Sequence, residues 1–210
     1  MLRNIKIFSL LALSLMLTGC LIPTVKNVTK EFKLEGSKNG VAFISLTQDN
    51  NYSIFHTYIY KNQSGNLEYY GDLESRVRGA FLPLFEDEEF PWPKTEQPNA
   101  YMGRVLALDL EPGEYVIRKW EVKFGQNLSI NPVKFPKKLK FIVNAGEVYY
   151  LGNIHMRVSE SNEVRPVIQD SYERDLAVFR KKYPNLSSDK VIKQIGYTGP
   201  WLPLAKVENK

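Results

Sequence analysis

The stretch GRVLALDLEPGEYVIRKWEVKF, residues 103–124, places two β-rich apolar runs on either side of a Pro-Gly pair. Pro112 sets φ and Gly113 accepts a positive φ, as the central residues of a type II turn require. We therefore predict that 103–110 and 115–124 pair as a hairpin. Side chains of the second run alternate between two faces. The face predicted to point to the core carries Val116, Arg118, Trp120, Val122 and Phe124.

Similar runs flank this stretch, with Gly, Asn and Pro between them. A buried strand is predicted at 41–47, and a hairpin at 53–72 with a loop of about five residues at NQSGN. The runs 139–143 and 147–158 are predicted to pair, and 164–168 forms a last short strand. Turns without intervening helices favour antiparallel pairing, so we expect a mainly β protein, an antiparallel β-sandwich of about 7–10 strands.

The C-terminal part changes to a helical period. One helical face carries Tyr172, Leu176, Phe179 and Tyr183. Asp170 is placed to cap the N-terminus of a helix, and Pro184 would end it. We therefore predict an amphipathic helix over about 170–183. A shorter helical turn is expected up to Ile195. We expect the longer helix to cover a sheet face or edge, giving one domain over residues 31–210.

The longest predicted loop is EDEEFPWPKTEQPN, residues 86–99, which has three prolines and no period. Loops of this length are usually functional or disordered. Trp92 and Tyr101 are candidate contacts for a sugar or a protein partner. Trp201, in the apolar tail YTGPWLPL, is the third candidate. The alternative is that the aromatic side chains of the loop fold back over the end of the sandwich.

Composition excludes several classes of protein. The chain has 210 residues, 43% of them apolar, which is too many for a disordered chain. Its single cysteine excludes an internal disulfide and a thiolate metal cluster. The net charge of +5 is modest, and we expect no nucleic-acid partner.

The first residues, MLRNIKIFSLLALSLMLTGC, have the pattern of a secretory signal peptide. Arg3 and Lys6 make the start positive, and an apolar run follows over residues 7–17. This run is too short for a bilayer span, which needs about 20 residues. The run ends at the lone cysteine, Cys20.

Leu17-Thr18-Gly19-Cys20 resembles the lipobox of bacterial lipoproteins. The resemblance implies that Cys20 receives a diacylglyceryl group and that residues 1–19 are removed. Residues 20–30 would then be a lipidated tether, anchored to the membrane through the acyl chains without spanning it. Leu21, the residue after the cysteine, implies sorting to the outer membrane. In a host with a single membrane, the anchor would lie in the cell membrane. The alternatives are a plain signal peptide or a chance cysteine in a buried helix.

A second resemblance lies in LEPGEY, residues 110–115, followed by AGEVYYLG from Ala145. The pair is similar to a pattern in small bacterial envelope lipoproteins of unknown function with a transthyretin-like or immunoglobulin-like β-sandwich. In that family the two strands are neighbours in one sheet. The resemblance implies the same fold and carries no catalytic residues.

Residues typical of catalysis or metal binding are sparse. His56 and His155 lie in separate strand-like runs, with no second histidine two or four positions away. This spacing favours a structural or surface role over metal binding or general-base catalysis. No Gly-x-Ser-x-Gly motif, P-loop, His-Glu-x-x-His motif or calcium loop occurs. Cys20 would be consumed by lipid. We therefore expect no catalytic residue, metal or cofactor.

Two charged clusters each have two interpretations. The acidic run 86–89 is a solvated loop or a cation site without the spacing of a calcium loop. The basic cluster is either a protected sheet edge, which we favour, or a contact with anionic lipid. Its members are Lys134, Lys137, Lys138 and Lys140.

These observations together favour a lipid-anchored bacterial envelope protein, at the outer membrane, that serves as a binding or structural module and is not an enzyme. Its expected partners are the membrane, through the lipid on Cys20, and an envelope protein or glycan. One alternative is an envelope hydrolase or carbohydrate-acting enzyme. The other is an accessory subunit of a larger envelope complex.

Overall fold

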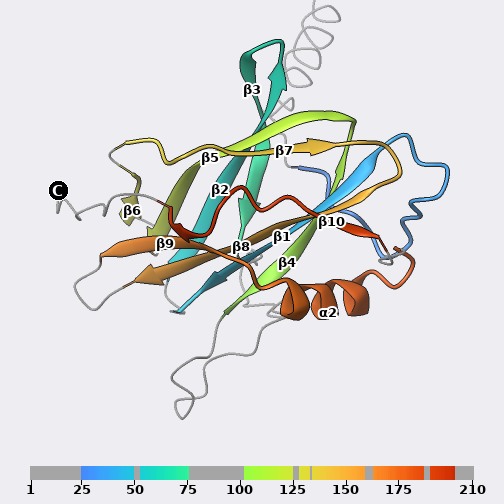
Figure 1. Cartoon of the computed structure of the whole chain (residues 1–210). Helices are drawn as coiled ribbons and strands as arrows, with labels where there is room; N and C mark the ends of the chain where they lie inside the picture. Colours follow the sequence, from blue (N-terminus) through green and yellow to red (C-terminus); the bar gives the residue numbers. More distant parts are fainter. Residues whose placement is uncertain are drawn as a thin grey trace, which may run out of the picture.

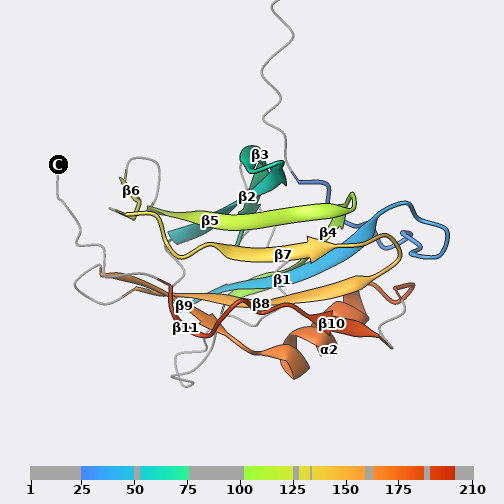
Figure 2. The ribbon, with the colours of Figure 1, turned by 45° about the horizontal axis from the view of Figure 1, so that its top comes forward.

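The computed structural model describes seven segments of the chain, with eleven strands and one helix among them. The strands form two sheets that pack face to face, and the helix lies on the outer side of one sheet (Figure 1, Figure 2). The expected fold class, a β-sandwich with a C-terminal helix, is confirmed. The described segments are 25–49, 53–75, 102–124, 128–132, 134–158, 163–186 and 190–201.

Sheet A has the strand order β11-β9-β8-β1-β4, with β10 also paired to β8. Its central pair, β1 and β8, is parallel, and β10 is parallel to β8 as well, so pairing is not antiparallel throughout. The segment before Ile195 is strand β10, so the helical turn expected there is wrong. The bounds are β1 (Gly40–Gln48), β4 (Met102–Leu110), β8 (Val148–Val158), β9 (Val164–Gln169), β10 (Val191–Lys193) and β11 (Gly199–Pro200).

Sheet B has the order β3-β2-β5-β6, with β7 also paired to β5, and each of these pairs is antiparallel. The predicted hairpin at 53–72 is present as β2 and β3, but its turn has two residues and not about five. Ser64 and Gly65 both have positive φ, 52° and 93°, as in a type I′ turn. The bounds are β2 (Ser53–Gln63), β3 (Asn66–Glu74), β5 (Gly113–Phe124), β6 (Leu128–Ile130) and β7 (Leu139–Val143).

The hairpin predicted for 103–124 is wrong. Strand β4 pairs with β1 in sheet A, and β5 pairs with β2 in sheet B, so the chain crosses between sheets near Pro112. The Tyr115 hydroxyl donates to the Glu111 carbonyl oxygen at 2.9 Å and closes this corner. Because the chain crosses, the apolar faces of both runs meet in one core, which contains Leu108 and Ile117. In a hairpin the two runs would instead have been neighbours in a single sheet.

The run 139–158 makes a second corner of the same kind. Strand β7 belongs to sheet B and β8 to sheet A, so their predicted pairing is wrong. The family resemblance implied that β5 and β8 are neighbours in one sheet, and this is also wrong. At both corners a short turn connects two strands that lie in opposite sheets. The turn residues alone do not show whether the two strands pair or separate.

A β-bulge in β5 changes which side chains face the core. Ile117 pairs with Ile59, but Lys119 pairs with Tyr58, so Arg118 is the extra residue. The predicted core face is therefore correct after the bulge and wrong up to it: Tyr115 and Ile117 face the core in place of Val116 and Arg118. Arg118 contacts the aromatic rings of Tyr60 and Phe135 instead. The core-facing residues of β5 are Tyr115, Ile117, Trp120 and Val122.

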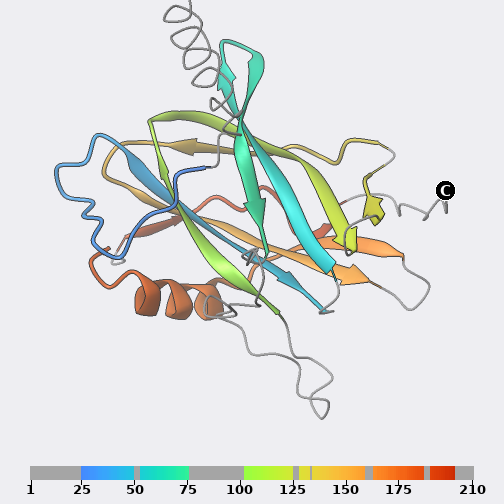
Figure 3. The same cartoon turned by 180° about the vertical axis from the view of Figure 1, so that it is seen from behind.

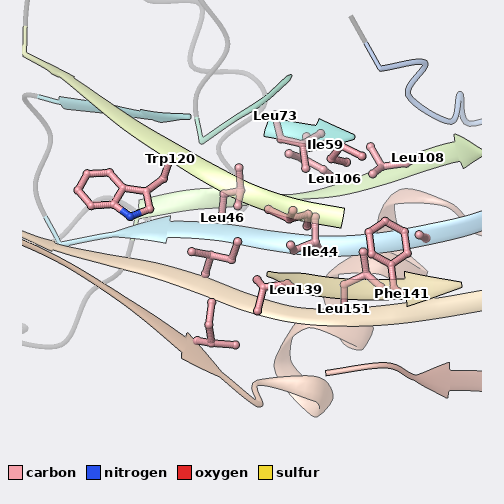
Figure 4. Close-up of a cluster of buried hydrophobic side chains, with 14 of the residues drawn as sticks. Ile44, Leu46, Ile59, Leu73, Leu106, Leu108, Trp120, Leu139, Phe141 and Leu151 are labelled. Carbon is pink, nitrogen blue, oxygen red and sulfur yellow. The ribbon is translucent and has the colours of Figure 1, made fainter. Parts of the chain in front are cut away.

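Strand β1 is buried along its whole length because both of its faces are covered. Ile44 and Leu46 point into the core between the sheets, beside Trp120 and Leu106 (Figure 4). Phe43 points the other way and stacks on Phe179 of the helix, with ring centres 4.2 Å apart. An apolar run without alternation is the sequence signature of such a doubly covered strand.

Helix α2 (Tyr172–Lys182) uses the predicted face, with Leu176, Phe179 and Tyr183 buried against sheet A. The Asp170 carboxylate accepts a hydrogen bond from the Tyr172 N–H at 3.2 Å. The last turn carries Arg180, Lys181 and Lys182. Their positive charges interact favourably with the negative end of the helix dipole.

The domain begins earlier than residue 31. Val25 and Val28 are buried, and the Val28 N–H donates to the Ala107 carbonyl oxygen at 2.8 Å. The Lys26 carbonyl oxygen accepts from the Asp109 N–H at 3.0 Å. Residues 25–28 therefore pack along β4, and only residues before Val25 can serve as the predicted tether.

Candidate functional site

The predicted site residues fall into two groups. Cys20, Trp92 and Tyr101 lie outside the described residues. Trp201 is fully buried, its indole N–H donates to the Lys137 carbonyl oxygen at 2.8 Å, and it is part of the core between the sheets. The prediction that Trp201 contacts a ligand or partner is therefore wrong, because the indole is buried in the core.

The basic cluster lies on and before the edge strand β7. The Gln194 side chain accepts from the Ile142 N–H at 2.9 Å and donates to the Ile142 carbonyl oxygen at 2.7 Å. This amide occupies backbone groups on the side of β7 that faces away from β5, which supports the protected-edge interpretation. Phe135, beside Lys134, is 63% exposed.

The candidate site is the outer face of sheet B, the side turned away from the core. Phe55 and Ile59 of β2 point into the core, so the intervening His56 and Tyr58 point outward. Helix α2 contacts β1, β4 and β8 of sheet A, and no described helix covers sheet B (Figure 2, Figure 3). The face is formed by His56, Tyr58, Tyr60, Tyr69, Asp72, Glu74, Arg118, Lys119 and Glu121.

Aromatic rings and cations make up one half of this face. The Tyr69 ring centre lies 6.4 Å from that of Tyr58 and 5.9 Å from that of Tyr60. The Arg118 guanidinium lies 5.6 Å from the Tyr60 ring centre and 4.3 Å from that of Phe135. Such a surface offers flat apolar area with polar tips, which suits stacking on a sugar or anchoring a protein partner.

Acidic groups and a histidine make up the other half. His56 Nδ1 lies 3.2 Å from Glu74 Oε1 and 3.7 Å from Asp72 Oδ2, and the imidazole is only 1% exposed. The Tyr58 hydroxyl donates to Glu121 Oε2 at 2.5 Å, and Ser129 donates to the other oxygen. Burial opposes the ionisation of Glu121, but these hydrogen bonds outweigh it and hold the pKa of that carboxyl below its usual range.

The outer face of sheet A holds a different polar group, buried beneath α2. Asp175 accepts hydrogen bonds from Ser45 Oγ at 2.5 Å and from the Tyr150 hydroxyl at 2.7 Å. Arg174 Nη2 lies 2.7 Å from Asp175 Oδ1. Burial raises the pKa of Asp175 in spite of these partners. The group joins helix to sheet with its hydrogen bonds satisfied, as buried polar groups require.

His155 belongs to the same buried layer. Thr47 Oγ1 lies 2.9 Å from His155 Nδ1 and donates to Asn153 Oδ1 at 2.9 Å. Burial, followed by the positive charges of Arg157 and Arg174, lowers the pKa of His155 to about 4. The imidazole is thus neutral near pH 7, and its surroundings support the structural role predicted for it.

Two pockets lie on or beside sheet B. The larger, about 410 Å³, is lined by Lys26, Lys61, Glu68, Tyr69 and Glu111, among others. It adjoins the aromatic half of the outer face through Tyr69. Its volume lies within the usual range of ligand sites, about 300–1,000 Å³. The smaller, about 240 Å³, lies beside the edge strand β7.

Comparisons of the chain with protein-family models, with curated proteins and with solved structures gave no match. Among the described residues, no helix combines the length and apolarity needed to cross a bilayer.

The cluster of His56 with Asp72 and Glu74 has no signature in short sequence spacings, because the two carboxylates lie 16 and 18 positions after the histidine. The missing signal is the hairpin turn. A two-residue turn at Ser64 and Gly65, with one bulge later in the ladder, places His56 directly opposite Glu74. A five-residue loop over 62–66 would instead place His56 opposite Asp72, and the pairing with Glu74 would be lost.

Proposed function

We propose that this protein is a lipid-anchored component of the bacterial envelope, at the outer membrane, and acts there as a binding module. Cys20 is its attachment point, and the outer face of sheet B is its recognition surface. The observation that carries the binding role is the group of tyrosine rings and Arg118 on this face, which no described helix covers. The expected partner is an envelope protein or glycan.

The start of the packed domain sets the distance from the membrane. Five residue steps separate Cys20 from the buried Val25, and an extended chain spans at most about 18 Å over that length. A lipid on Cys20 would therefore hold the sandwich close to the head groups. Lys26, just after Val25, lines the pocket that contains Tyr69, so the recognition surface begins near the anchored end.

The anchor is tested by replacing the modified thiol. Cys20→Ser should abolish metabolic labelling with an alkyne-tagged fatty acid and release the protein from the membrane fraction, because only the thiol can form the thioether. Ser14→Ala, which changes the apolar run and keeps the cysteine, serves as the matched control. Labelling that persists in Cys20→Ser would show that the protein is not a lipoprotein.

The recognition surface is tested in the anchored protein by crosslinking and pull-down. Tyr60→Ala and Arg118→Ala should lower recovery of the partner, or of purified envelope glycan, by about tenfold or more, since aromatic and arginine anchors dominate interfaces. Lys181→Ala, exposed on α2, is the control. Equal recovery with all three variants would place recognition elsewhere. Glycan turnover would favour the hydrolase alternative, and a stoichiometric protein partner the accessory-subunit alternative.

A further inference from the structure

The acidic half of the outer face of sheet B has the geometry of a metal site. His56 lies on β2, and Asp72 and Glu74 lie on the adjacent strand β3, with His56 directly opposite Glu74. One nitrogen of the imidazole and one oxygen of each carboxylate all lie within 4.8 Å of one another. These three side chains converge from two paired strands, which gives them a fixed backbone frame.

We propose that His56 Nδ1, Asp72 and Glu74 bind a divalent transition metal of the zinc class. In a tetrahedral zinc site the bonds are about 2.0–2.1 Å, so neighbouring ligand atoms lie about 3.3 Å apart. The observed separations from Nδ1 are 3.2 Å to Glu74 Oε1 and 3.7 Å to Asp72 Oδ2. Small rotations of two partly exposed carboxylates therefore suffice to enclose an ion.

The donor set selects the class of ion. Imidazole nitrogen with carboxylate oxygen suits zinc, manganese or iron, whereas calcium and magnesium sites are built from oxygen alone. Three protein ligands leave a position for water, as in open zinc sites.

The surroundings favour a cation. Glu121 lies opposite His56 on β5 and adds a third carboxylate beside the cluster. Its oxygens are occupied by Tyr58 and Ser129, so it contributes charge and does not compete as a ligand. On β5, Lys123 lies 3.6 Å from Glu121, Lys119 lies over the Tyr58 ring, and Arg118 lies over the Tyr60 and Phe135 rings. From β4, Arg104 Nε donates to the Glu74 carbonyl oxygen at 2.9 Å.

A protonated imidazolium held between the two carboxylates is the competing state of this cluster, and it predicts no metal binding. The two states are separated by titrating the full chain in detergent, after removal of bound metal with a chelator, by calorimetry with Zn²⁺. We expect one equivalent to bind. Co²⁺ in its place should give the visible spectrum of a four-coordinate site.

Asp72→Asn and Glu74→Gln preserve size and should each weaken Zn²⁺ binding by at least about tenfold, and the rise in thermal midpoint caused by Zn²⁺ should be lost. Glu68→Gln removes a carboxylate from the same strand and should bind as the unchanged chain does. Absence of stoichiometric binding, equal affinity in all three variants, or tighter binding of Ca²⁺ than Zn²⁺ would overturn the proposal.

The titration is repeated in the Cys20→Ser background, where the thiol cannot supply a ligand. The metal proposal needs neither the lipid nor a partner. Its failure in a chain that is still labelled by fatty acid would leave the proposed function intact.

Discussion

The outer faces of the two sheets have opposite characters, and each contains one buried histidine. On sheet A, α2 packs Phe179 onto Phe43, and His155 Nδ1 lies 2.9 Å from Thr47 Oγ1 within a buried polar layer. On sheet B, His56 faces two carboxylates beside a group of tyrosines. The contrast fits a stabilising role for the face of sheet A and the recognition role proposed for the face of sheet B, and three predictions test it.

The largest expected effect comes from Phe179→Ala. This side chain is fully buried between α2 and sheet A, so its loss should lower the free energy of unfolding by about 3–5 kcal/mol, through lost transfer energy and a cavity. Tyr69→Ala, at 37% exposure on the opposite sheet, should cost less than about 1 kcal/mol. Urea unfolding followed by circular dichroism measures both. Similar losses for the two variants would remove the division between a stabilising face and a recognition face.

The next effect is the pH dependence caused by His155. Its pKa of about 4 in the folded chain lies below the ordinary value of 6.5, so below pH 6.5 the unfolded chain takes up a proton that the folded chain does not. The free energy of unfolding should therefore fall as pH drops from about 6.5 to 4, by about 3 kcal/mol from this group.

His155→Gln isolates this contribution, because carboxylates also titrate in acid. Urea unfolding at pH 7 and pH 4.5 should show a smaller difference in the variant than in the unchanged chain. An equal difference in both would mean that His155 is not held neutral by the layer beneath α2.

The smallest effect concerns the turn that sets the register of the His56 cluster. Ser64 has φ of 52°, which asparagine tolerates better in a type I′ turn, so Ser64→Asn should stabilise the chain by about 0.5 kcal/mol. Gly65→Ala should have the opposite effect, because a Cβ is strained at φ of 93°. Thermal unfolding measures both. A loss of stability in Ser64→Asn would contradict the turn geometry.

The sequence pattern predicted strands and helices well where the spacing of apolar residues matches the face that is buried. The run at 41–47 is strand β1, and the spacing of Leu176 and Phe179 predicted the buried face of α2. The candidate site was predicted poorly. Trp201, in an apolar tail, was predicted to contact a ligand or partner, but its indole is part of the core. An apolar side chain has the same sequence signal whether it is buried or presented to a partner.

The sequence by itself determined the fold class, most strand positions and the C-terminal helix, because side-chain period and turn residues are local properties. Only the tertiary structure decided that 103–110 and 115–124 lie in opposite sheets, that Arg118 bulges, and that His56 meets Glu74. Those outcomes depend on which distant strands bury one another's apolar faces. That choice is made by the packing of the whole sandwich, and no short window of sequence contains it.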